Sequence, residues 1–480
     1  MNKRFGFITQ FPKTFWLANT MELFERWAYY GVFVPLSIYL TDPVSNGGLG
    51  FTSDQRGVMQ AVATGILYLF PILGGALADK FGFRKVLLAA FATLASGYFA
   101  MGQFSSYALV FTAFLIVAIG AALFKPIIVA TVSKTTSKKN DTIGFAIFYM
   151  IVNIGGFLGP FVASKLRVLD WTFVFTMSAA VILINLILLY FYKEPNRKEN
   201  KKDESLIQSI RQILMNMKVA LSDFKFLTFL IIMVGFWIVY MQLFFTLPVF
   251  ITQWVDTSDV YNSSSFLASA IGTVQDGVGI IQPEQIVNLA AFTIIFFQLI
   301  TARLIMRFKP IVTMIVGTVI ISLAMGQFSL QTVGILIILA VVIFAFGEMI
   351  SSPRIQEYIG RIAPKDKVAL YMGVSFLPVA GGNFFGGLLS GNLYGNMSDK
   401  YVLLKTELAE RGFASIENMQ NMDGALLFKE AMTYLQMNQQ QLNELLYTKY
   451  QPGNIWLVFG AIGVGTSLLL FLYNRFMLKN

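Results

Sequence analysis

Residues 22–30 read Glu-Leu-Phe-Glu-Arg-Trp-Ala-Tyr-Tyr, inside an apolar segment from about 15 to 40 that is long enough to cross a bilayer as a helix. Charged and aromatic positions of this segment follow helical spacing and share one face: Glu22, Glu25, Arg26, Tyr29 and Phe33. Each charge at the middle of a membrane costs about 2.5–3.5 kcal/mol on insertion scales, so we expect this face to line a protein interior or a wet cavity. Such carboxylates are typical of a proton or substrate site, and the alternative is an inert buried ion cluster.

The composition indicates a helical membrane protein. Of 480 residues, 56% are hydrophobic and 13% are charged, a balance that soluble domains of this length do not show. The net charge of +10 is concentrated in short loops between apolar segments, which indicates membrane orientation and not nucleic-acid binding. Without Cys or His, the chain has no disulfide, no thiol chemistry and few ways to hold a metal, so a proton relay must use carboxylates. We expect no enzyme activity, no metal site and no cofactor other than a proton gradient.

The order of apolar segments predicts an all-α integral membrane fold with about twelve transmembrane helices. The segments lie at about 14–40, 54–78, 86–103, 107–132, 143–163, 172–192, 226–253, 285–306, 311–329, 333–359, 369–393 and 455–476. They divide into six-helix halves at 1–192 and 226–480, joined by a charged cytoplasmic linker at 193–225. Part of this linker, Ser205–Leu221, is either an amphipathic surface helix or a plain connection. A further insertion at about 396–453 is expected to form a small extracytoplasmic helical cap.

The loop charges predict the orientation. Lys80, Arg84 and Lys85 follow the second segment, and the later even-numbered segments are also followed by basic loops. By contrast, the loop 254–284 has acidic residues and no Lys or Arg. The positive-inside rule then places both termini in the cytoplasm of a multi-pass protein, which we assign to a bacterial inner membrane.

An internal repeat relates the two halves. Gly-Ala-Ala-Leu-Phe-Lys-Pro at 120–126 aligns with Gly-Glu-Met-Ile-Ser-Ser-Pro at 347–353, at an offset of 227 residues (353 − 126). The same offset aligns Gly155 with Gly382. Two six-helix halves related in parallel are the architecture of the major facilitator superfamily, in which the solute site lies near the midplane between the halves.

The ionisable residues well inside the segments cluster in only three of them: Glu22, Glu25, Arg26, Lys125, Glu348, Arg354 and Glu357. Clustering of this kind argues for one shared cavity. The repeat places Lys125 in the register of Ser352, with Glu348 one helical turn earlier in the second half. We expect the cation and the anion to face each other across the midplane, an arrangement that suits a zwitterionic solute.

Other charged positions are expected to serve gating. Asp79 and Arg84 lie in a tight basic turn between the second and third segments, which suits a conformational latch at the inner face. Arg354 and Glu357 lie nearer the inner end of the tenth segment, where a gate ion pair or a cytoplasmic-edge pair is the favoured interpretation. The sequence contains no phosphate-binding loop, metal-ligand cluster or nucleophile constellation, so ATP-driven transport by this chain is unsupported.

The stretch at 22–30 resembles the ExxERFxYY motif of proton-coupled oligopeptide transporters, with Trp27 in place of Phe. Residues 148–155, Phe-Tyr-x-x-x-Asn-x-Gly, resemble that family's second signature. The stretches 120–126 and 347–353 are similar to its fourth and tenth helices. The resemblance covers essentially the whole chain.

The resemblance implies roles for matching residues. The proton-coupling network would consist of Glu22, Glu25, Arg26 and Lys125. The peptide site would include Tyr29, Tyr30, Tyr68, Asn153, Trp237, Gln242, Asn288 and Glu348. Within that site, the Glu348 carboxylate would meet the free amino terminus of the peptide.

Two positions depart from the family. Phe33 occupies the place of a basic residue that usually binds the peptide carboxylate. Tyr240 lies near the place of an acidic residue in the seventh helix. We keep both, together with Ser352, as candidate substrate contacts. Without an ion pair between the first and seventh helices, we expect hydrophobic packing to close the outer gate.

These features predict a proton-driven symporter that imports di- and tripeptides or related zwitterions by alternating access. Its partners would be the small substrate, protons and membrane lipid, without nucleic acid, and we expect a monomer. One alternative is the same fold carrying another solute, such as an amino-acid derivative, an organic anion or a drug. A second alternative is a non-transporting receptor or assembly partner that uses the insertion at 396–453.

Overall fold

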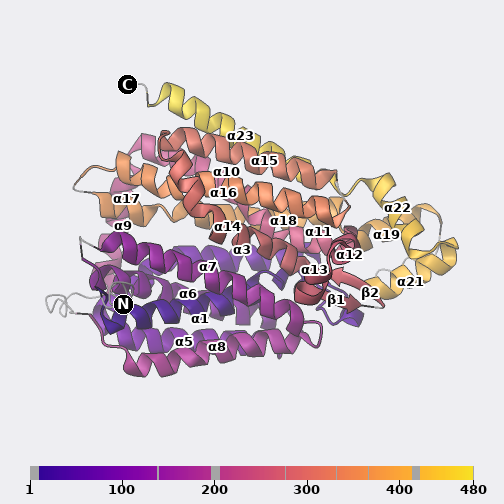
Figure 1. The fold of residues 1–480 in the computed structure, drawn as a ribbon, viewed down its shortest axis with the longest axis horizontal. Coiled ribbons are helices and arrows are strands. Elements are labelled where there is room, and N and C mark those ends of the chain that lie inside the picture. The colour runs from indigo at the N-terminus through magenta and orange to yellow at the C-terminus, as the bar shows by residue number, and fades with distance from the viewer. Residues whose placement is uncertain are drawn as a thin grey trace.

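The structure is a computed structural model that describes residues 10–137, 140–195, 206–275, 277–330, 332–365, 367–412 and 422–478. Long helices run side by side along the longest axis of the molecule (Figure 1). Both termini lie at one end of this bundle, which we call the terminal end. The most basic part of the predicted linker, 196–205, lies outside the described residues.

The first half contains six helical segments, two of which are broken. They are α1 (Lys13–Phe33) with α2 (Leu36–Thr41), α3 (Ser53–Leu69) with α4 (Pro71–Phe81), α5 (Phe83–Met101), α6 (Tyr107–Thr135), α7 (Asp141–Leu166) and α8 (Trp171–Phe191). A short 3₁₀ turn, η2 (Val44–Asn46), follows α2. The axes of α3 and α4 differ by 42°, and the break falls at Pro71 because proline cannot donate a backbone hydrogen bond.

The second half also contains six segments. They are α10 (Phe224–Phe245) with α11 (Leu247–Trp254), α14 (Pro283–Ile305), α15 (Pro310–Ser329), α16 (Gly334–Ile362), α17 (Val368–Val374) with α18 (Leu377–Met397), and α23 (Asn454–Phe476). Between the halves lies α9 (Leu206–Leu221). The all-α fold predicted from the sequence, with twelve segments in two six-helix halves, is confirmed.

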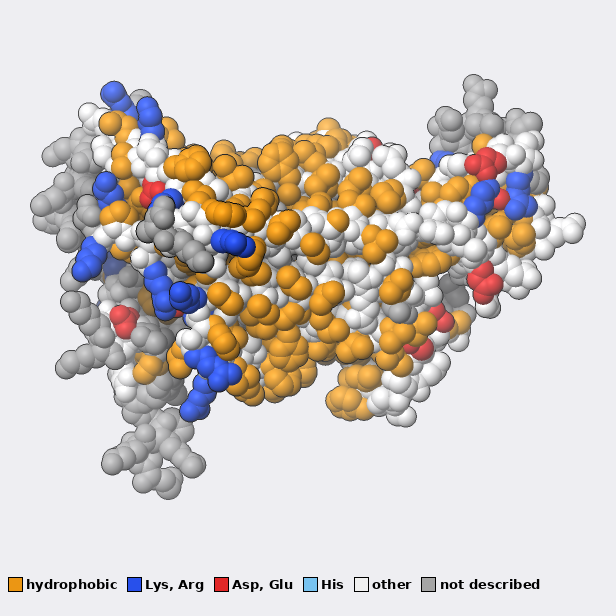
Figure 2. All heavy atoms as spheres, turned by 90° about the horizontal axis from the view of Figure 1, so that it is seen from above, with side chains coloured by type: hydrophobic (Ala, Val, Ile, Leu, Met, Phe, Trp, Pro, Cys, Tyr) orange, Lys and Arg blue, Asp and Glu red, His pale blue; other side chains and the backbone are white. Residues whose placement is uncertain are grey.

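Nine of the described helices are long and apolar enough to cross a membrane on their own, and the bent pair α3–α4 adds a tenth. Charge lowers the hydropathy of the other two segments. Helix α1 carries Glu22, Glu25 and Arg26 in its middle turns, and α5 carries Arg84 and Lys85 in its first turn. Hydrophobic side chains cover the middle of the face in Figure 2, with Lys and Arg gathered at the left, terminal end. The chain is a multi-pass membrane protein.

The repeat extends to the helix boundaries. The starts of α5 and α15, of α6 and α16, and of α7 and α17 are separated by the same interval (310 − 83, 334 − 107 and 368 − 141 all give 227). The last residues of α6 and α16 keep it as well (362 − 135). The repeated glycines make equivalent packing contacts, because a Cβ on Gly120 would meet the neighbouring α5, and one on Gly347 the neighbouring α15.

Helices of the two halves meet along two seams. On one side α3 packs along α18, and on the other α7 packs on α14. Within the first half α1 packs on α6, α7 and α8, so its charged face is enclosed by its own half.

The other end of the bundle carries a small cap, formed by α19 (Lys400–Glu410), α21 (Gly424–Leu435) and α22 (Gln439–Tyr450) (Figure 1). We call this the cap end. The loop after α11 also lies here and folds into α12 (Ser258–Ser263), α13 (Ser265–Ile271) and an antiparallel hairpin of β1 (Gly272–Gln275) and β2 (Val278–Ile281). The apolar pattern of the sequence does not indicate this hairpin.

Candidate functional site

The charged face of α1 is buried in the first half. Glu22, Glu25 and Arg26 expose 2%, 0% and 4% of their surface. Arg26 Nε donates to Glu25 Oε2 at 2.5 Å, and the same Nε lies 3.4 Å from Glu22 Oε1. Two carboxylates therefore share one guanidinium.

Each of these carboxylates keeps one unsatisfied atom. Among the described residues, Glu22 Oε2 and Glu25 Oε1 have no hydrogen-bond partner. A buried acceptor without a donor is costly, commonly by about 1–3 kcal/mol. A proton on either oxygen would remove a buried negative charge, so these two oxygens are the candidate protonation sites of the cluster.

Lys125 joins this cluster from α6. Its Nζ lies 4.6 Å from the ring centroid of Tyr68, on α3, which is a cation–π distance. It is also within electrostatic range of Glu22, Glu25 and Arg26. The structure thus brings together all four residues of the predicted proton-coupling network.

Close packing of α7 fixes the position of α1. A Cβ on Gly155 would lie 2.6 Å from Leu23 O, and one on Gly159 would lie 2.4 Å from Trp27 O. Only glycine permits such an approach of two helix backbones. The Gly of the second sequence signature therefore sets the distance between α7 and the charged helix.

A cavity of about 180 Å³ lies between the halves. Its walls come from α1 and α7 on one side and from α10, α14 and α16 on the other. The polar lining consists of Tyr30, Tyr149, Asn153, Tyr240, Asn288, Glu348 and Ser352. Among the described lining residues, Glu348 is the only Asp, Glu, Lys or Arg.

Tyr240 holds the carboxylate of Glu348 in this cavity. Tyr240 Oη donates to Glu348 Oε1 at 3.0 Å. The phenol comes from α10 and the carboxylate from α16, so the bond also ties two helices of the second half. A charge-assisted bond of this type contributes about 1.5–3 kcal/mol.

Tyr30 connects the cavity with the charged cluster. It lines the cavity, and its ring centroid lies 5.9 Å from Arg26 Cζ. The guanidinium also lies 4.9 Å from the ring centroid of Tyr29. One layer of aromatic rings thus separates the charged cluster from the cavity.

The other predicted substrate contacts lie beside the described cavity wall and not on it: Tyr29, Phe33, Tyr68, Lys125, Trp237 and Gln242. Gln242 is fully buried and donates to Gly386 O at 3.3 Å, which ties α10 to α18. Trp237 packs against Gly382 on the same helix pair. We expected Lys125 to face Glu348 across the cavity, but the structure places it in the α1 cluster, behind the aromatic layer.

Polar contacts join the halves at the cap end. Arg167, which follows α7, forms an ion pair with the fully buried Glu284 in the first turn of α14 and donates to Gln282. Gln285 Nε2 donates to Ser164 Oγ at 2.5 Å. The sequence does not reveal this ion pair, because both partners lie at segment ends, where charge is ordinary.

A buried arginine joins the two halves along the opposite seam, between α3 and α18. Arg56 of α3 is fully buried and donates to two carbonyls of the second half, Phe245 O and Ser390 O, the latter at 3.0 Å. Nearby, a Cβ on Gly391 would lie 2.7 Å from Ser53 O. The α3–α18 seam therefore depends on direct backbone contact.

The cap is also bonded to the first half. Asp423 caps the N-terminus of α21 and accepts a hydrogen bond from Ser45 Oγ at 2.5 Å. Asp399 caps α19 and accepts from Ser53 Oγ at 2.8 Å. In both cases one carboxylate caps a helix of the cap and also accepts a hydrogen bond from a serine of the first half.

An aromatic cluster closes the space between α1 and α10. Phe33 stacks on Tyr29 at 4.9 Å between ring centroids, and it lies 5.9 Å from both Phe244 and Phe245. Phe33 exposes only 3% of its surface. The expected hydrophobic packing between the first and seventh segments is thus present, and Phe33 serves in it.

The predicted gating residues lie near the terminal end. Arg84 Nη2 donates to Tyr190 O at 3.5 Å, within the first half. Arg354 pairs with Glu357 and also donates to Ile305 O, within the second half. Asp79 is exposed at the end of α4. For Arg84, Arg354 and Glu357, these contacts stay inside one half.

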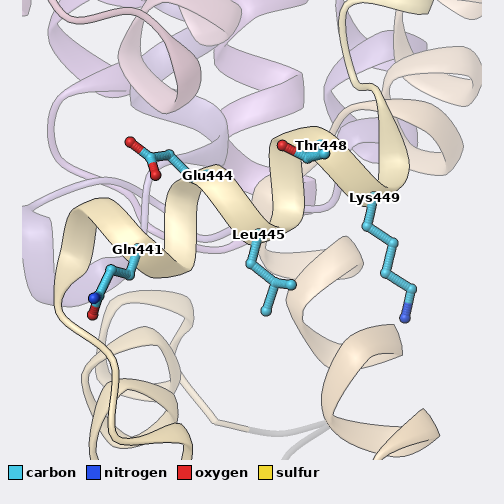
Figure 3. A pocket seen from close by; sticks show the side chains of 5 residues that line it. All are labelled: Gln441, Glu444, Leu445, Thr448 and Lys449. Atoms are coloured by element: carbon cyan, nitrogen blue, oxygen red, sulfur yellow. The ribbon is translucent and has the colours of Figure 1, made fainter.

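A separate surface depression lies on the cap. Figure 3 shows that its lining residues all come from α22: Gln441, Glu444, Leu445, Thr448 and Lys449. The side chains of Glu444 and Lys449 point to opposite sides of the helix and do not converge. We assign no binding role to this depression.

Comparison with known proteins decides the family. The Major Facilitator Superfamily model matches residues 15–275, which is more than half of the chain. The chain belongs to the Major Facilitator Superfamily. Among curated relatives of this superfamily member, dipeptide and tripeptide permease A of Yersinia pestis is 29% identical over 213 residues. That alignment covers 42% of this chain and 41% of the permease, so the match spans about two-fifths of the relative's length.

Two further matches are informative. A Na(+), Li(+), K(+)/H(+) antiporter of Planococcus maritimus is 24% identical and aligns over 74% of this chain and 84% of its own length. A solved POT family transporter in complex with 5-aminolevulinic acid superposes with a TM-score of 0.72 at 16% identity, covering 98% of this chain and 97% of that chain. The resemblance to the oligopeptide transporters is confirmed, and the structural match supports their common fold.

Proposed function

We propose that this superfamily member is a proton-coupled symporter for short peptides or related zwitterions. One observation carries the proposal: a buried cluster of two carboxylates and two cations shares Tyr30 with a cavity between the two halves. Protonation of the cluster changes the charge next to Tyr30. Solute binding and proton binding then act on the same helix, α1.

We place the terminal end in the cytoplasm of a bacterial cell and the cap outside the inner membrane. The basic loops at the terminal end support this orientation. In it, the contacts at the cap end close the outer side of the cavity. Tyr149, which lies towards the terminal end of the cavity wall on α7, is 45% exposed. The structure then corresponds to a state that is closed to the outside in an alternating-access cycle.

The polar lining suits a peptide. Glu348 offers a carboxylate to a substrate ammonium, whereas Asn153 and Asn288 offer amides to a peptide bond. Asn288 Oδ1 has no hydrogen-bond partner among the described residues. The names of two curated relatives, dipeptide and tripeptide permease A of Yersinia pestis and a peptide transporter of Yersinia enterocolitica, support the same substrate class. We propose a monomer that needs no cofactor and catalyses no reaction.

A second candidate is an amine whose other end is uncharged. The absence of Lys and Arg among the described lining residues favours it, because no cation on the wall binds a carboxylate. Such a solute uses Glu348 in the same way as a peptide. The two candidates differ only in what the far end of the cavity binds.

The test is thermal unfolding of the purified protein with four ligands: a free dipeptide, its C-terminal amide, its N-acetyl form, and a simple amine. The peptide proposal predicts that the free dipeptide stabilises the protein most and that N-acetylation abolishes the effect. Stronger stabilisation by the amide or the amine favours the second candidate. No stabilisation by any of the four contradicts both.

A further inference from the structure

The linker helix α9 carries three different faces. At 3.6 residues per turn, its side chains divide into three adjoining sectors. One sector is buried or half-buried against the bundle: Ile210, Ile213, Met217, Ala220 and Leu221. A second is exposed and uncharged, with Val219 among polar side chains: Gln208, Gln212 and Asn216. The third is exposed, apolar and cationic: Arg211, Leu214, Met215 and Lys218.

The third sector has the composition of a membrane-surface contact. Leu214 and Met215 expose 59% and 54% of their surface. Arg211 and Lys218 lie among them, and α9 contains no Asp or Glu. Arg and Lys reach polar headgroups while their aliphatic stems lie along apolar neighbours. Exposed apolar side chains beside cations, on a helix without acidic residues, are typical of a helix that lies at a membrane surface.

The position of α9 fits this contact. The helix lies at the terminal end of the bundle, near α17 (Figure 1). It packs on α4 of the first half and on α10 and α17 of the second. The same end carries most of the Lys and Arg visible in Figure 2. The cationic sector is therefore at the level where the spans leave the membrane.

We propose that this sector of α9 docks on the membrane leaflet at the terminal end and binds the headgroups of anionic phospholipids. The two cations supply the charge complementarity, and the side chains of Leu214 and Met215 enter the acyl boundary. Helix α9 touches both halves. When it is bound to lipid, it therefore connects the two halves at the end of the bundle that must open and close during transport. The membrane charge then biases that conformational change.

The absence of Cys in the chain allows a direct test on the full-length protein. Leu214→Cys and Asn216→Cys, which lie in the third and second sectors, are labelled separately with an environment-sensitive fluorophore. Each variant is reconstituted in phosphatidylcholine vesicles with or without phosphatidylglycerol. Quenching is measured with a lipid-attached nitroxide and with aqueous iodide.

The proposal predicts that the nitroxide quenches the label at 214 severalfold more than the label at 216, with the reverse order for iodide. Phosphatidylglycerol should increase the difference. Each cation near an anionic surface is worth roughly a fivefold change in binding. Arg211→Gln with Lys218→Gln should therefore remove the response to phosphatidylglycerol.

The matched control removes the same charge elsewhere at the terminal end. Arg307→Gln with Lys309→Gln, in the connection between α14 and α15, should leave the response unchanged. Equal quenching of both labels, or equal loss of the response in both double variants, overturns the proposal. Shielding of the label at 214 from both quenchers would show that a protein surface covers this sector and would also overturn it. The readout needs no transport, so it does not depend on the proposed symport.

Discussion

Tyr240 Oη donates a hydrogen bond to Glu348 Oε1 at 3.0 Å, inside the cavity between the two halves. The bond leaves the second carboxylate oxygen for a ligand. It also fixes the rotamer of Glu348 before the ligand arrives, which lowers the entropic cost of binding. An uncharged phenol in α10 thus positions the only carboxylate among the described lining residues.

Tyr240→Phe should weaken binding of amine-bearing substrates by roughly tenfold, because Glu348 loses a donor worth about 1.5–3 kcal/mol but remains able to meet the ammonium. Binding affinity can be measured by calorimetry or by thermal shift. Tyr358→Phe is the matched control, since its hydroxyl bonds that of Tyr473 at 2.9 Å. Equal weakening by both variants, or equal loss for an N-acetylated ligand, would mean that Tyr240 does not act through Glu348.

Arg167→Ala should open the cap end, because it leaves the buried Glu284 without its cation. Removing one partner of a buried ion pair commonly costs about 3–5 kcal/mol. The measurement is the rate at which a membrane-impermeant thiol reagent labels Val287→Cys, a cavity position, from outside. We expect an increase of at least tenfold. The exchanged pair Arg167→Glu with Glu284→Arg should return the rate towards that of the parent, and failure to do so would argue against this ion pair as the closing contact.

Gly391→Leu should hold the α3–α18 seam apart. A Cβ at this position already lies 2.7 Å from Ser53 O and 2.8 Å from Gly57 Cα, so a longer side chain has no space in the closed state. Labelling of Val287→Cys should rise, and uptake should fall. Gly465→Leu on α23 is the control, because a Cβ there meets nothing within 4 Å. If Gly391→Leu stays closed and active, the close contact of these helices is not required for transport.

Closure of the cap end should depend on pH through Asp42, which follows α2. Burial raises the pKa of Asp42 from its ordinary value of 3.8 to about 6, against the opposing effect of Arg167 and with small additions from Glu284 and Asp423. A carboxyl whose pKa is raised in the closed state binds its proton more tightly there. The closed state therefore gains stability as pH falls from above 6 towards 4, and loses it as pH rises through that window.

The same labelling assay, run between pH 4 and 8, tests this sign. Labelling of Val287→Cys should slow as the pH falls through about 6, and Asp42→Asn should flatten this part of the profile. Asp423→Asn serves as the contrast. Burial raises the pKa of Asp423, but hydrogen bonds from Ser45 and from the backbone of α21 outweigh this effect and lower it. The stability that ionised Asp423 gives to the closed state is therefore lost only at more acidic pH. An unchanged profile in Asp42→Asn would remove Asp42 from the gate.

The sequence predicted the membrane fold well, because apolar length and the 227-residue repeat are properties of the chain itself. It also predicted the α1 cluster, since Glu22, Glu25 and Arg26 lie on one helical face in a place where charge is expensive. Contacts between segments far apart in the chain were harder to predict from the sequence. Arg56 and Glu284 lie at segment ends, where their burial follows only from the approach of the other half.

The placement of Lys125 illustrates the same limit. The repeat correctly related α6 to α16, but it carried no information on the rotation of each helix or on the aromatic layer of Tyr29 and Tyr30. Those features decide that Lys125 lies beside the charged residues of α1, whereas Glu348 faces the cavity. The hairpin of β1 and β2 was missed because each strand has only four residues.

The most direct test of the central claim compares gradient-driven accumulation with exchange in proteoliposomes. Glu22→Gln with Glu25→Gln removes both carboxyl groups of the buried cluster and preserves their size. If the cluster couples protons to solute, the double variant loses accumulation of a labelled dipeptide against its gradient, yet retains exchange between internal and external dipeptide. Accumulation at the parent level by this variant, under an imposed inward proton gradient, would contradict the account.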